Sequence, residues 1–310
     1  MQKKILVAID DSTPSRQAVD YANRMRELIP SLGFTLFHVQ PSISQFLLDE
    51  AKRSSQAQAE LNTIAARTAE ASRGLLAKYR DMLMRAGVAE PAVELATQPR
   101  HQGIAKDILD YAQDGLFDAI LVGRRGISPV EQMFMGSVSA HLIENSPVIP
   151  VWLVDGDVRS TRVMAAVDGS ESALRAVDHV AFMLSGNPQA RVRFFHVTPR
   201  LREYCEVDFD STPGGGLETL IAQGNKRCMD DFFAAALTRL REAGVRQDRI
   251  ETRTEATLVS VSESILAAAR DEGFGTIVMG RRGLNRSFFG GKVSYHVSQK
   301  LSDAALWLVP

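Results

Sequence analysis

The stretch Lys4-Ile-Leu-Val-Ala-Ile-Asp10 recurs as Arg162-Val-Met-Ala-Ala-Val-Asp168 at an offset of 158 residues. Each copy is a short apolar run that ends on an aspartate. Runs of this kind are typical of strands that are buried on both faces of a parallel sheet. A repeat at this distance indicates that one domain is present twice.

Four further pairs of segments repeat in the same order along the chain. They are residues 36–39 with 194–197, 118–126 with 275–283, 136–142 with 291–297, and 151–154 with 306–309. The offset falls only from 158 to 155 residues, as short loop deletions in one copy would produce. We therefore predict two domains, over residues 1–157 and 158–310, with the polar stretch 155–161 as the linker.

Apolar runs and segments of helical period alternate within each half. In the first half they predict strands at about 4–10, 33–39, 91–96, 117–122 and 149–154, and helices at about 13–28, 44–87, 103–113 and 136–145. The long segment 44–87 is predicted as one helix or two. This alternation favours parallel strands joined by right-handed crossovers. The predicted class is α/β, with two tandem Rossmann-like domains, each a doubly wound five-stranded parallel sheet flanked by helices.

Composition limits the classes of partner. The 36 Lys and Arg residues against 37 Asp and Glu leave a net charge of -1, so no basic field favours nucleic acid or an anionic membrane. The two cysteines, Cys205 and Cys228, are too few for a disulfide framework or a zinc site. No apolar run reaches the roughly 18 residues that span a bilayer, and no signal peptide is evident. We expect a soluble cytoplasmic protein without nucleic-acid or membrane partners.

Two glycine turns follow the fourth strand of the first half. Gly123 and Gly126 come directly after that strand, and Gly136 and Ser137 open the next helix. Ligands of open α/β sheets bind beyond the carboxyl ends of the strands. Glycines allow backbone N–H groups to approach a polyphosphate, and a helix N-terminus adds further N–H groups. The spacing predicts that both turns contact one phosphate chain, with Arg124 able to neutralise part of its charge.

At these residues the chain resembles the universal stress protein family. Its nucleotide-binding members carry GxxG, nine residues, and then Gly followed by Ser or Thr, and the segment from Gly123 to Ser137 matches that pattern in full. The resemblance extends once over each half, so the chain is similar to a tandem member. It includes the strand-one aspartates and the ends of the second strands, which in the family contact the adenine. The candidate site in the first domain thus comprises Asp10, Val39, Gly123, Arg124, Gly126, Gly136, Ser137 and Ser139.

The resemblance implies a function and an assembly. It implies that the protein binds ATP or a related adenine nucleotide, with or without Mg²⁺. It also implies a stress-response sensor or regulator rather than a fast enzyme. It also implies that strands at 148–154 and 304–309 pair as in the family's dimers, and that whole chains form a homodimer. Asp11 places a carboxylate near the expected phosphates, which disfavours a polyphosphate unless a cation intervenes.

The second half departs from the pattern. Seven residues instead of nine separate Gly283 from Gly291, and Lys292 replaces the serine. Either the altered segment still forms a pocket, with Lys292 as a point charge, or the two turns no longer contact the same ligand. The candidate second site comprises Asp168, Val197, Gly280, Gly283, Gly291, Lys292 and Ser294.

Structural explanations of the same residues stay open. The glycines can simply allow tight strand-to-helix turns, and Asp10 and Asp168 can cap the helices that follow them. The arginines of both motifs can form ion pairs. The four histidines near the motifs, His38, His141, His196 and His296, are expected mainly to pack or to form hydrogen bonds, with a pH-dependent role as the alternative.

Two other functions remain as alternatives. One is a nucleotide-free interaction scaffold that uses the long helices or the Gly-rich loop at 202–216. The other is a slow ATP hydrolase related to the wider adenine-nucleotide α-hydrolase-like group. That second alternative lacks support in the motifs, since neither strand-one loop supplies SGGxDS and no GxSxG or HExxH is present. We therefore assign no catalytic residue and no protein metal ligand.

Overall fold

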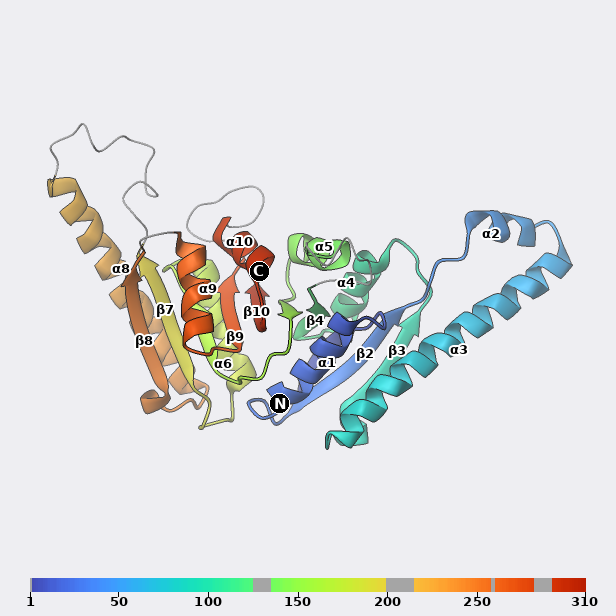
Figure 1. Cartoon of the computed structure of the whole chain (residues 1–310), viewed down its shortest axis with the longest axis horizontal. Coiled ribbons are helices and arrows are strands. Elements are labelled where there is room, and N and C mark those ends of the chain that lie inside the picture. Colours follow the sequence, from blue (N-terminus) through green and yellow to red (C-terminus); the bar gives the residue numbers. More distant parts are fainter. Residues whose placement is uncertain (1, 125–134, 199–214, 258–259, 282–291) are drawn as a thin grey trace. The chain divides into compact units, whose positions relative to one another are not determined.

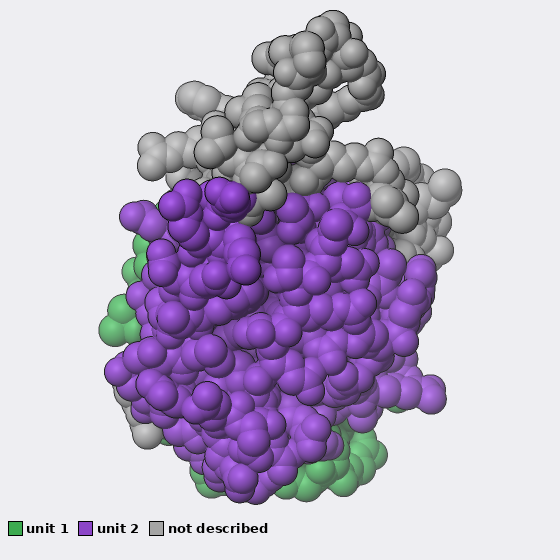
Figure 2. Space-filling model, turned by 90° about the vertical axis from the view of Figure 1, so that its left-hand side faces the viewer, with its two compact units in different colours: residues 1–23, 31–154 green, residues 24–30, 155–310 purple. Residues whose placement is uncertain are grey.

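The computed structural model describes residues 2–124, 135–198, 215–257, 260–281 and 292–310, without the side chains of 215–222. The chain divides into two compact units, coloured separately in Figure 2. Unit 1 comprises Met1–Asn23 and Ser31–Val154, and unit 2 comprises Arg24–Pro30 and Asp155–Pro310. Among the described residues, no helix combines the length and apolarity that crossing a bilayer requires.

Unit 1 is a parallel sheet with helices packed against it (Figure 1). Its elements are β1 (Lys3–Ala8), α1 (Thr13–Met25), β2 (Leu32–Val39), α2 (Gln45–Ala51), α3 (Ser55–Arg85), η1 (Glu90–Ala92), β3 (Val93–Gln98), α4 (Ile104–Asp114), β4 (Ala119–Gly123), α5 (Ser137–Asn145) and β5 (Val151–Asp155). The strand order is β3-β2-β1-β4-β5, and each of the four neighbouring pairs is parallel. Strand order reverses between β1 and β4, which is where α/β sheets of this kind bind ligands.

Unit 2 repeats the plan with the order β10-β9-β6-β7-β8. Its elements are β6 (Val163–Ala166), α6 (Glu171–Leu184), β7 (Val192–Thr198), α8 (Gly215–Glu242), η4 (Gln247–Arg249), β8 (Ile250–Ala256), α9 (Val261–Asp271), β9 (Thr276–Gly280), α10 (Lys292–Lys300) and β10 (Ala304–Val309). The predicted α/β class, with parallel strands flanked by helices, is confirmed.

Some element boundaries differ from the prediction for local reasons. Pro91 opens the short helix η1, so the third strand begins at Val93 rather than near residue 91. The segment 44–87 forms two helices, because Ser54 interrupts it and accepts a hydrogen bond from the Ala57 N–H at 3.3 Å. The predicted loop 202–216 lies outside the described residues except for its last two, Gly215 and Gly216, which begin α8.

The central strands are buried on both faces, which explains their continuous apolar runs. In β1, Ile5, Leu6 and Val7 are fully buried, and Trp152 of β5 and Trp307 of β10 are fully buried at matching places in the two units. The burial of helix α3 changes along its length. Its buried residues all lie from Ser72 onward, so residues 55–71 contribute nothing buried to the core.

Helices α4 and α9 occupy matching places in the two units and end with the same motif but with different residues. After α4, Leu116 has a positive φ of 51°, and the Phe117 N–H donates to the Ala112 carbonyl at 3.1 Å. After α9, Gly273 has a φ of 70° at the matching place. This left-handed conformation is less favourable for an L-residue than for glycine. The Leu116 side chain is 86% exposed, so its packing contributes little to offset this cost.

We therefore expect Leu116→Gly to stabilise unit 1 by about 1 kcal/mol. The matched change Gly273→Leu should destabilise unit 2 by a similar amount. Urea unfolding followed by tryptophan fluorescence measures both, because Trp152 and Trp307 report one unit each. A destabilised Leu116→Gly protein would show that this residue carries no backbone strain.

A second expectation concerns pH. Burial lowers the pKa of His179 from 6.5 to about 3, and its ring packs edge-on against Trp307 with centroids 5.6 Å apart. Below pH 6.5 His179 is protonated in the unfolded chain but stays neutral in the folded chain. The free energy of unfolding therefore falls as the pH drops towards 3. Between pH 6.5 and 5 this amounts to about 2 kcal/mol for unit 2. His179→Leu should flatten the slope of unfolding free energy against pH over this range, and an unchanged slope would contradict the assignment.

Candidate functional site

The loop between β1 and α1 is organised around the Asp10 carboxylate. Its Oδ1 accepts hydrogen bonds from the hydroxyls of Ser12 and Ser15, both at 2.5 Å, and from the Ser12 N–H at 3.2 Å. The Ser15 hydroxyl also accepts from the Asp10 N–H at 3.0 Å, and the Ser12 hydroxyl accepts from the Ser15 N–H at 3.1 Å. Neither serine was predicted as a site residue. Their spacing, two and five residues after an aspartate that ends a strand, was the available signal.

The matching loop of unit 2 is simpler. The Asp168 Oδ1 accepts from the Ser170 N–H at 3.1 Å, and the Ser170 hydroxyl caps α6 by accepting from the Ala173 N–H at 3.1 Å. Ala173 occupies the place of Ser15, so this position has no hydroxyl to offer the aspartate. The predicted capping role of the strand-one aspartates is therefore wrong: the hydroxyls of Ser12 and Ser170 accept the N–H groups of the first helical turns, and each aspartate accepts the N–H of that serine.

Asp11 has a structural explanation that the sequence did not provide. Its φ of 60° matches the φ of 80° at Gly169, so both loops turn through the left-handed region at this residue. The Asp11 carboxylate pairs with Lys78 of α3 at 3.2 Å. This cation offsets the charge that was expected to disfavour a polyphosphate.

The ends of the second strands are fixed by histidines. The Nδ1 of His38 lies 2.7 Å from the Ile9 carbonyl, and the Nδ1 of His196 lies 2.9 Å from the Val167 carbonyl. A carbonyl only accepts, so both rings carry the proton on Nδ1. Burial lowers the pKa of His196, which keeps it neutral. The expected hydrogen-bonding role of these two histidines is confirmed, whereas His141 and His296 are exposed on α5 and α10.

The residues that are predicted to contact adenine lie next to these histidines. Val39 and Val197 directly follow the two histidines at the ends of β2 and β7, where they are 7% and 5% exposed. Because β1 pairs in parallel with β2, Asp10 and Val39 lie at the same edge of the sheet of unit 1. Asp168 and Val197 share the corresponding edge in unit 2, where β6 pairs with β7.

Gly123 and Gly280 have a packing reason to be glycine. A methyl group on Gly123 would lie 2.6 Å from the Pro14 Cβ and 2.7 Å from its carbonyl carbon, and one on Gly280 would lie 2.6 Å from the Ser172 carbonyl carbon. The first turns of α1 and α6 therefore approach the strand ends more closely than any side chain allows. This contact supports the structural explanation of these two glycines, and their contact with a ligand stays a prediction.

The start of α5 is anchored to the end of β4. The Arg124 N–H donates to the Val154 carbonyl at 2.7 Å, and the Gly136 N–H donates to the Arg124 carbonyl at 2.9 Å. The Ser139 hydroxyl donates to the Gly123 carbonyl at 2.7 Å. Ser139 and Arg124 are each 3% exposed, so both belong to the packed base of the segment, whereas Ser137 is exposed at the first turn of α5. Gly126 lies outside the described residues.

Unit 2 anchors α10 in a related way. The Arg281 N–H donates to the Val309 carbonyl at 2.7 Å, and the Ser294 hydroxyl donates to the Arg281 carbonyl at 2.9 Å. The serine bond therefore reaches one residue further along than its counterpart in unit 1, which agrees with the shorter segment between strand and helix. Lys292 is exposed as the first residue of α10. Gly283 and Gly291 lie outside the described residues.

The charges near Asp10 act on a buried tyrosine, Tyr79 of α3. Burial, and then the carboxylates of Asp11 and Asp10, raise the pKa of Tyr79 to about 12. Within the part of the chain that the structure describes, no group of three His, Cys, Asp or Glu side chains is arranged to hold a metal ion.

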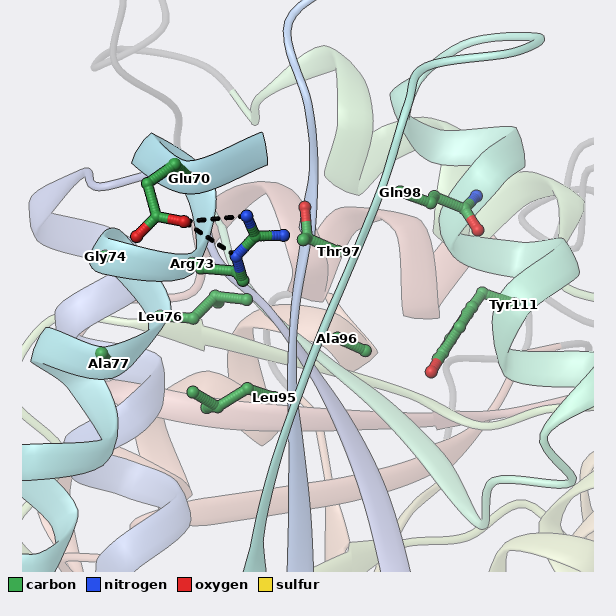
Figure 3. Close-up of a pocket in the computed structure, with 10 residues that line it drawn as sticks. All are labelled: Glu70, Arg73, Gly74, Leu76, Ala77, Leu95, Ala96, Thr97, Gln98 and Tyr111. Atoms are coloured by element: carbon green, nitrogen blue, oxygen red, sulfur yellow. Dashed lines mark hydrogen bonds and ion pairs between the residues drawn. The ribbon is translucent and has the colours of Figure 1, made fainter. Parts of the chain in front are cut away.

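A separate groove of about 590 Å³ runs between α3 and the edge strand β3 (Figure 3). Leu76 and Ala77 of α3 and Leu95 and Ala96 of β3 line it, together with Tyr111 of α4, whose ring stacks on Phe37 at 4.3 Å. At one end of the groove, the Arg73 guanidinium forms an ion pair with Glu70 of the same helix at 2.8 Å. None of the predicted site residues that the structure describes lines this groove.

Each unit is thus an α/β domain with an aspartate, a histidine-fixed strand end and an anchored helix at one edge of its sheet. The model of the universal stress protein family matches residues 1–155 and again 160–305. The chain therefore belongs to the universal stress protein family and is a tandem member of it. Among curated protein sequences, none matches it significantly.

Solved structures support the fold over the full length. A universal stress protein from Archaeoglobus fulgidus DSM 4304 superposes with a TM-score of 0.66 at 18% identity, covering 99% of this chain and 97% of that one. A protein of unknown function from Pseudomonas aeruginosa PAO1 superposes with a TM-score of 0.58 at 14% identity, covering 99% of this chain and 92% of that one. These likenesses show the fold alone.

The close approach at Gly123 leads to a prediction about stability. Gly123→Ala should destabilise unit 1 by about 1–3 kcal/mol, because the new methyl group meets the backbone of Pro14. Gly74→Ala is the matched control, since an added Cβ there meets nothing within 4 Å and alanine favours a helix by up to about 1 kcal/mol. Urea unfolding measures both, and equal effects of the two changes would contradict the packing role.

Proposed function

We propose that unit 1 binds ATP or a related adenine nucleotide at the carboxyl edge of β1, β2 and β4. One observation carries this proposal. Strand β1 pairs with β2 on one side and β4 on the other, so Asp10, Val39 and the anchored start of α5 all lie at one edge, where the strand order reverses. In this proposal Asp10 and Val39 contact the base, as in the family the chain resembles.

The phosphates would lie towards α5. The first N–H groups of a helix have no partner within the helix, and they attract anions. Ser137 is exposed at this end and offers a hydroxyl. Gly123, Gly126 and Gly136 would allow the phosphates to approach the backbone. Mg²⁺ would bind chiefly through phosphate oxygens, as it does in many nucleotide sites.

The protein would act as a regulator rather than as a fast enzyme. No described residue forms a general base with an oriented partner beside the proposed phosphate position, and Asp10 is already held by two serines. In this role the nucleotide changes a conformation or a binding surface in response to stress. We extend the proposal to a homodimer of tandem chains. The nucleotide-free scaffold remains the alternative, because the packing of Gly123 explains that glycine without any ligand.

Ser137→Glu tests the proposal without disturbing the fold. A glutamate in the first turn of a helix is favourable for the helix by about 0.3–1 kcal/mol, yet it repels a phosphate at the same place. Titration calorimetry of ATP with Mg²⁺ should show one site per chain in the wild type, and at least tenfold weaker binding in Ser137→Glu with thermal stability retained.

Lys292→Glu is the matched change at the first residue of α10 in unit 2. Binding lost only in this variant would assign the nucleotide to unit 2. The absence of any heat from wild type that was purified free of nucleotide would favour the scaffold.

A further inference from the structure

We infer that Ser15 is the positioning residue that orients Asp10 towards the bound base, and that this serine makes the first unit the stronger nucleotide site. The inference rests on the function proposed above. It adds a residue that the resemblance did not supply and a reason why the two units differ.

Ser15 forms a closed ring with Asp10. Its hydroxyl accepts the Asp10 N–H at 3.0 Å and donates to Asp10 Oδ1 at 2.5 Å, so one side chain holds both the backbone and the carboxylate of the aspartate. Ser15 is 4% exposed, and its position in the first turn of α1 is itself fixed by the bond from its N–H to Ser12. A buried hydroxyl held in this way leaves the carboxylate little rotational freedom.

The orientation has a direct chemical consequence. Both serine hydroxyls donate to the same oxygen, Oδ1, while the Asp10 residue as a whole is exposed at the edge of the sheet. Among the described residues, Oδ2 accepts no hydrogen bond, so it is the oxygen available to a donor from a ligand. An ionised carboxylate only accepts, and the exocyclic amino group of adenine is a donor that suits it. A pre-oriented acceptor binds a donor better than a freely rotating one, because less conformational entropy is lost on binding.

Unit 2 provides the natural comparison. Ala173 replaces Ser15 at the matching place in α6, whereas Ser170 still occupies the place of Ser12. The backbone of the loop is therefore kept, but the ring that fixes the aspartate is missing its second hydroxyl. The units therefore differ at this edge in a hydroxyl that contacts the aspartate in unit 1, as well as in the glycine segment.

The test compares two ligands in three proteins. The ligands are ATP and purine riboside triphosphate, which differs from ATP only in lacking the 6-amino group. The proteins are the wild type, Ser15→Ala, and Ser15→Thr, which restores a hydroxyl. In the wild type we expect ATP to bind about tenfold more tightly than the analogue. In Ser15→Ala this preference should fall towards one, through weaker ATP binding and with the affinity for the analogue unchanged, and Ser15→Thr should recover most of it.

Ser146→Ala is the control for loss of a buried hydroxyl. Ser146 donates to the Ile149 carbonyl at 2.5 Å at the opposite end of the strands, so its removal should leave the preference for ATP unchanged. If Ser15→Ala keeps the full preference, or weakens both ligands equally, Ser15 does not position the carboxylate and the inference fails while the proposed function stands. If the wild type binds neither ligand, both the proposed function and this inference are contradicted.

Discussion

The contact between the first turn of α1 and the end of β4 constrains the rest of unit 1. Pro14 lies so close to Gly123 that no side chain fits between them, and the same is true of Ser172 and Gly280 in unit 2. This contact fixes two loops at once, because Asp10 lies just before α1 and Arg124 lies just after Gly123. The carbonyls next to the contact then hold α5, through Ser139 on Gly123 and Gly136 on Arg124. A steric requirement at one glycine thereby brings the candidate site together.

The fold was largely predictable because its signals are local and occur twice. Buried parallel strands produce continuous apolar runs, and the repeat of Lys4–Asp10 at Arg162–Asp168 assigned both sheets at once. The third strand begins two residues later than predicted, because Pro91 lies in the short helix before it. Ser54 marks the place where the long segment divides into two helices, which was one of its two predicted forms. Pro91 was visible in the sequence, but the apolar periodicity does not register such an interruption.

The site was less predictable than the fold. Gly123 and Gly280 end their strands as expected, but their packing against α1 and α6 depends on a distance between helix and strand that no spacing reveals. Lys78 pairs with Asp11 across 67 residues of sequence, because the register of α3 along the sheet places it there. Hydrogen bonds from Ser12 and Ser15 depend on the exact turn after β1. The sequence predicts which residues end strands, whereas tertiary packing decides what those residues contact.

The two units have kept their backbone constraints and changed their polar side chains. Both retain a histidine that bonds the carbonyl after the first strand, at His38 and His196, and both retain the glycine at the end of the fourth. The polar positions near the candidate site differ between the units: Ser15 of unit 1 corresponds to Ala173 of unit 2, and Asp11 corresponds to Gly169. This pattern is expected after duplication of a domain, because a copy that keeps its backbone constraints keeps its fold even when its polar side chains change.

The long helix α3 has a consequence for how unit 1 opens. Its inner half is held by Ser72, Leu76, Tyr79 and Leu83, while its outer half, residues 55–71, has no buried residue. Apart from the contact of α3 with the short helix α2, that half depends on its own hydrogen bonds and on the cap from Ser54. Isolated helices of this length are marginal in water. The outer turns therefore form a separate cooperative segment that can fray and exchange its amide protons while the sheet stays closed. In α3 the boundary between the two behaviours falls at Ser72.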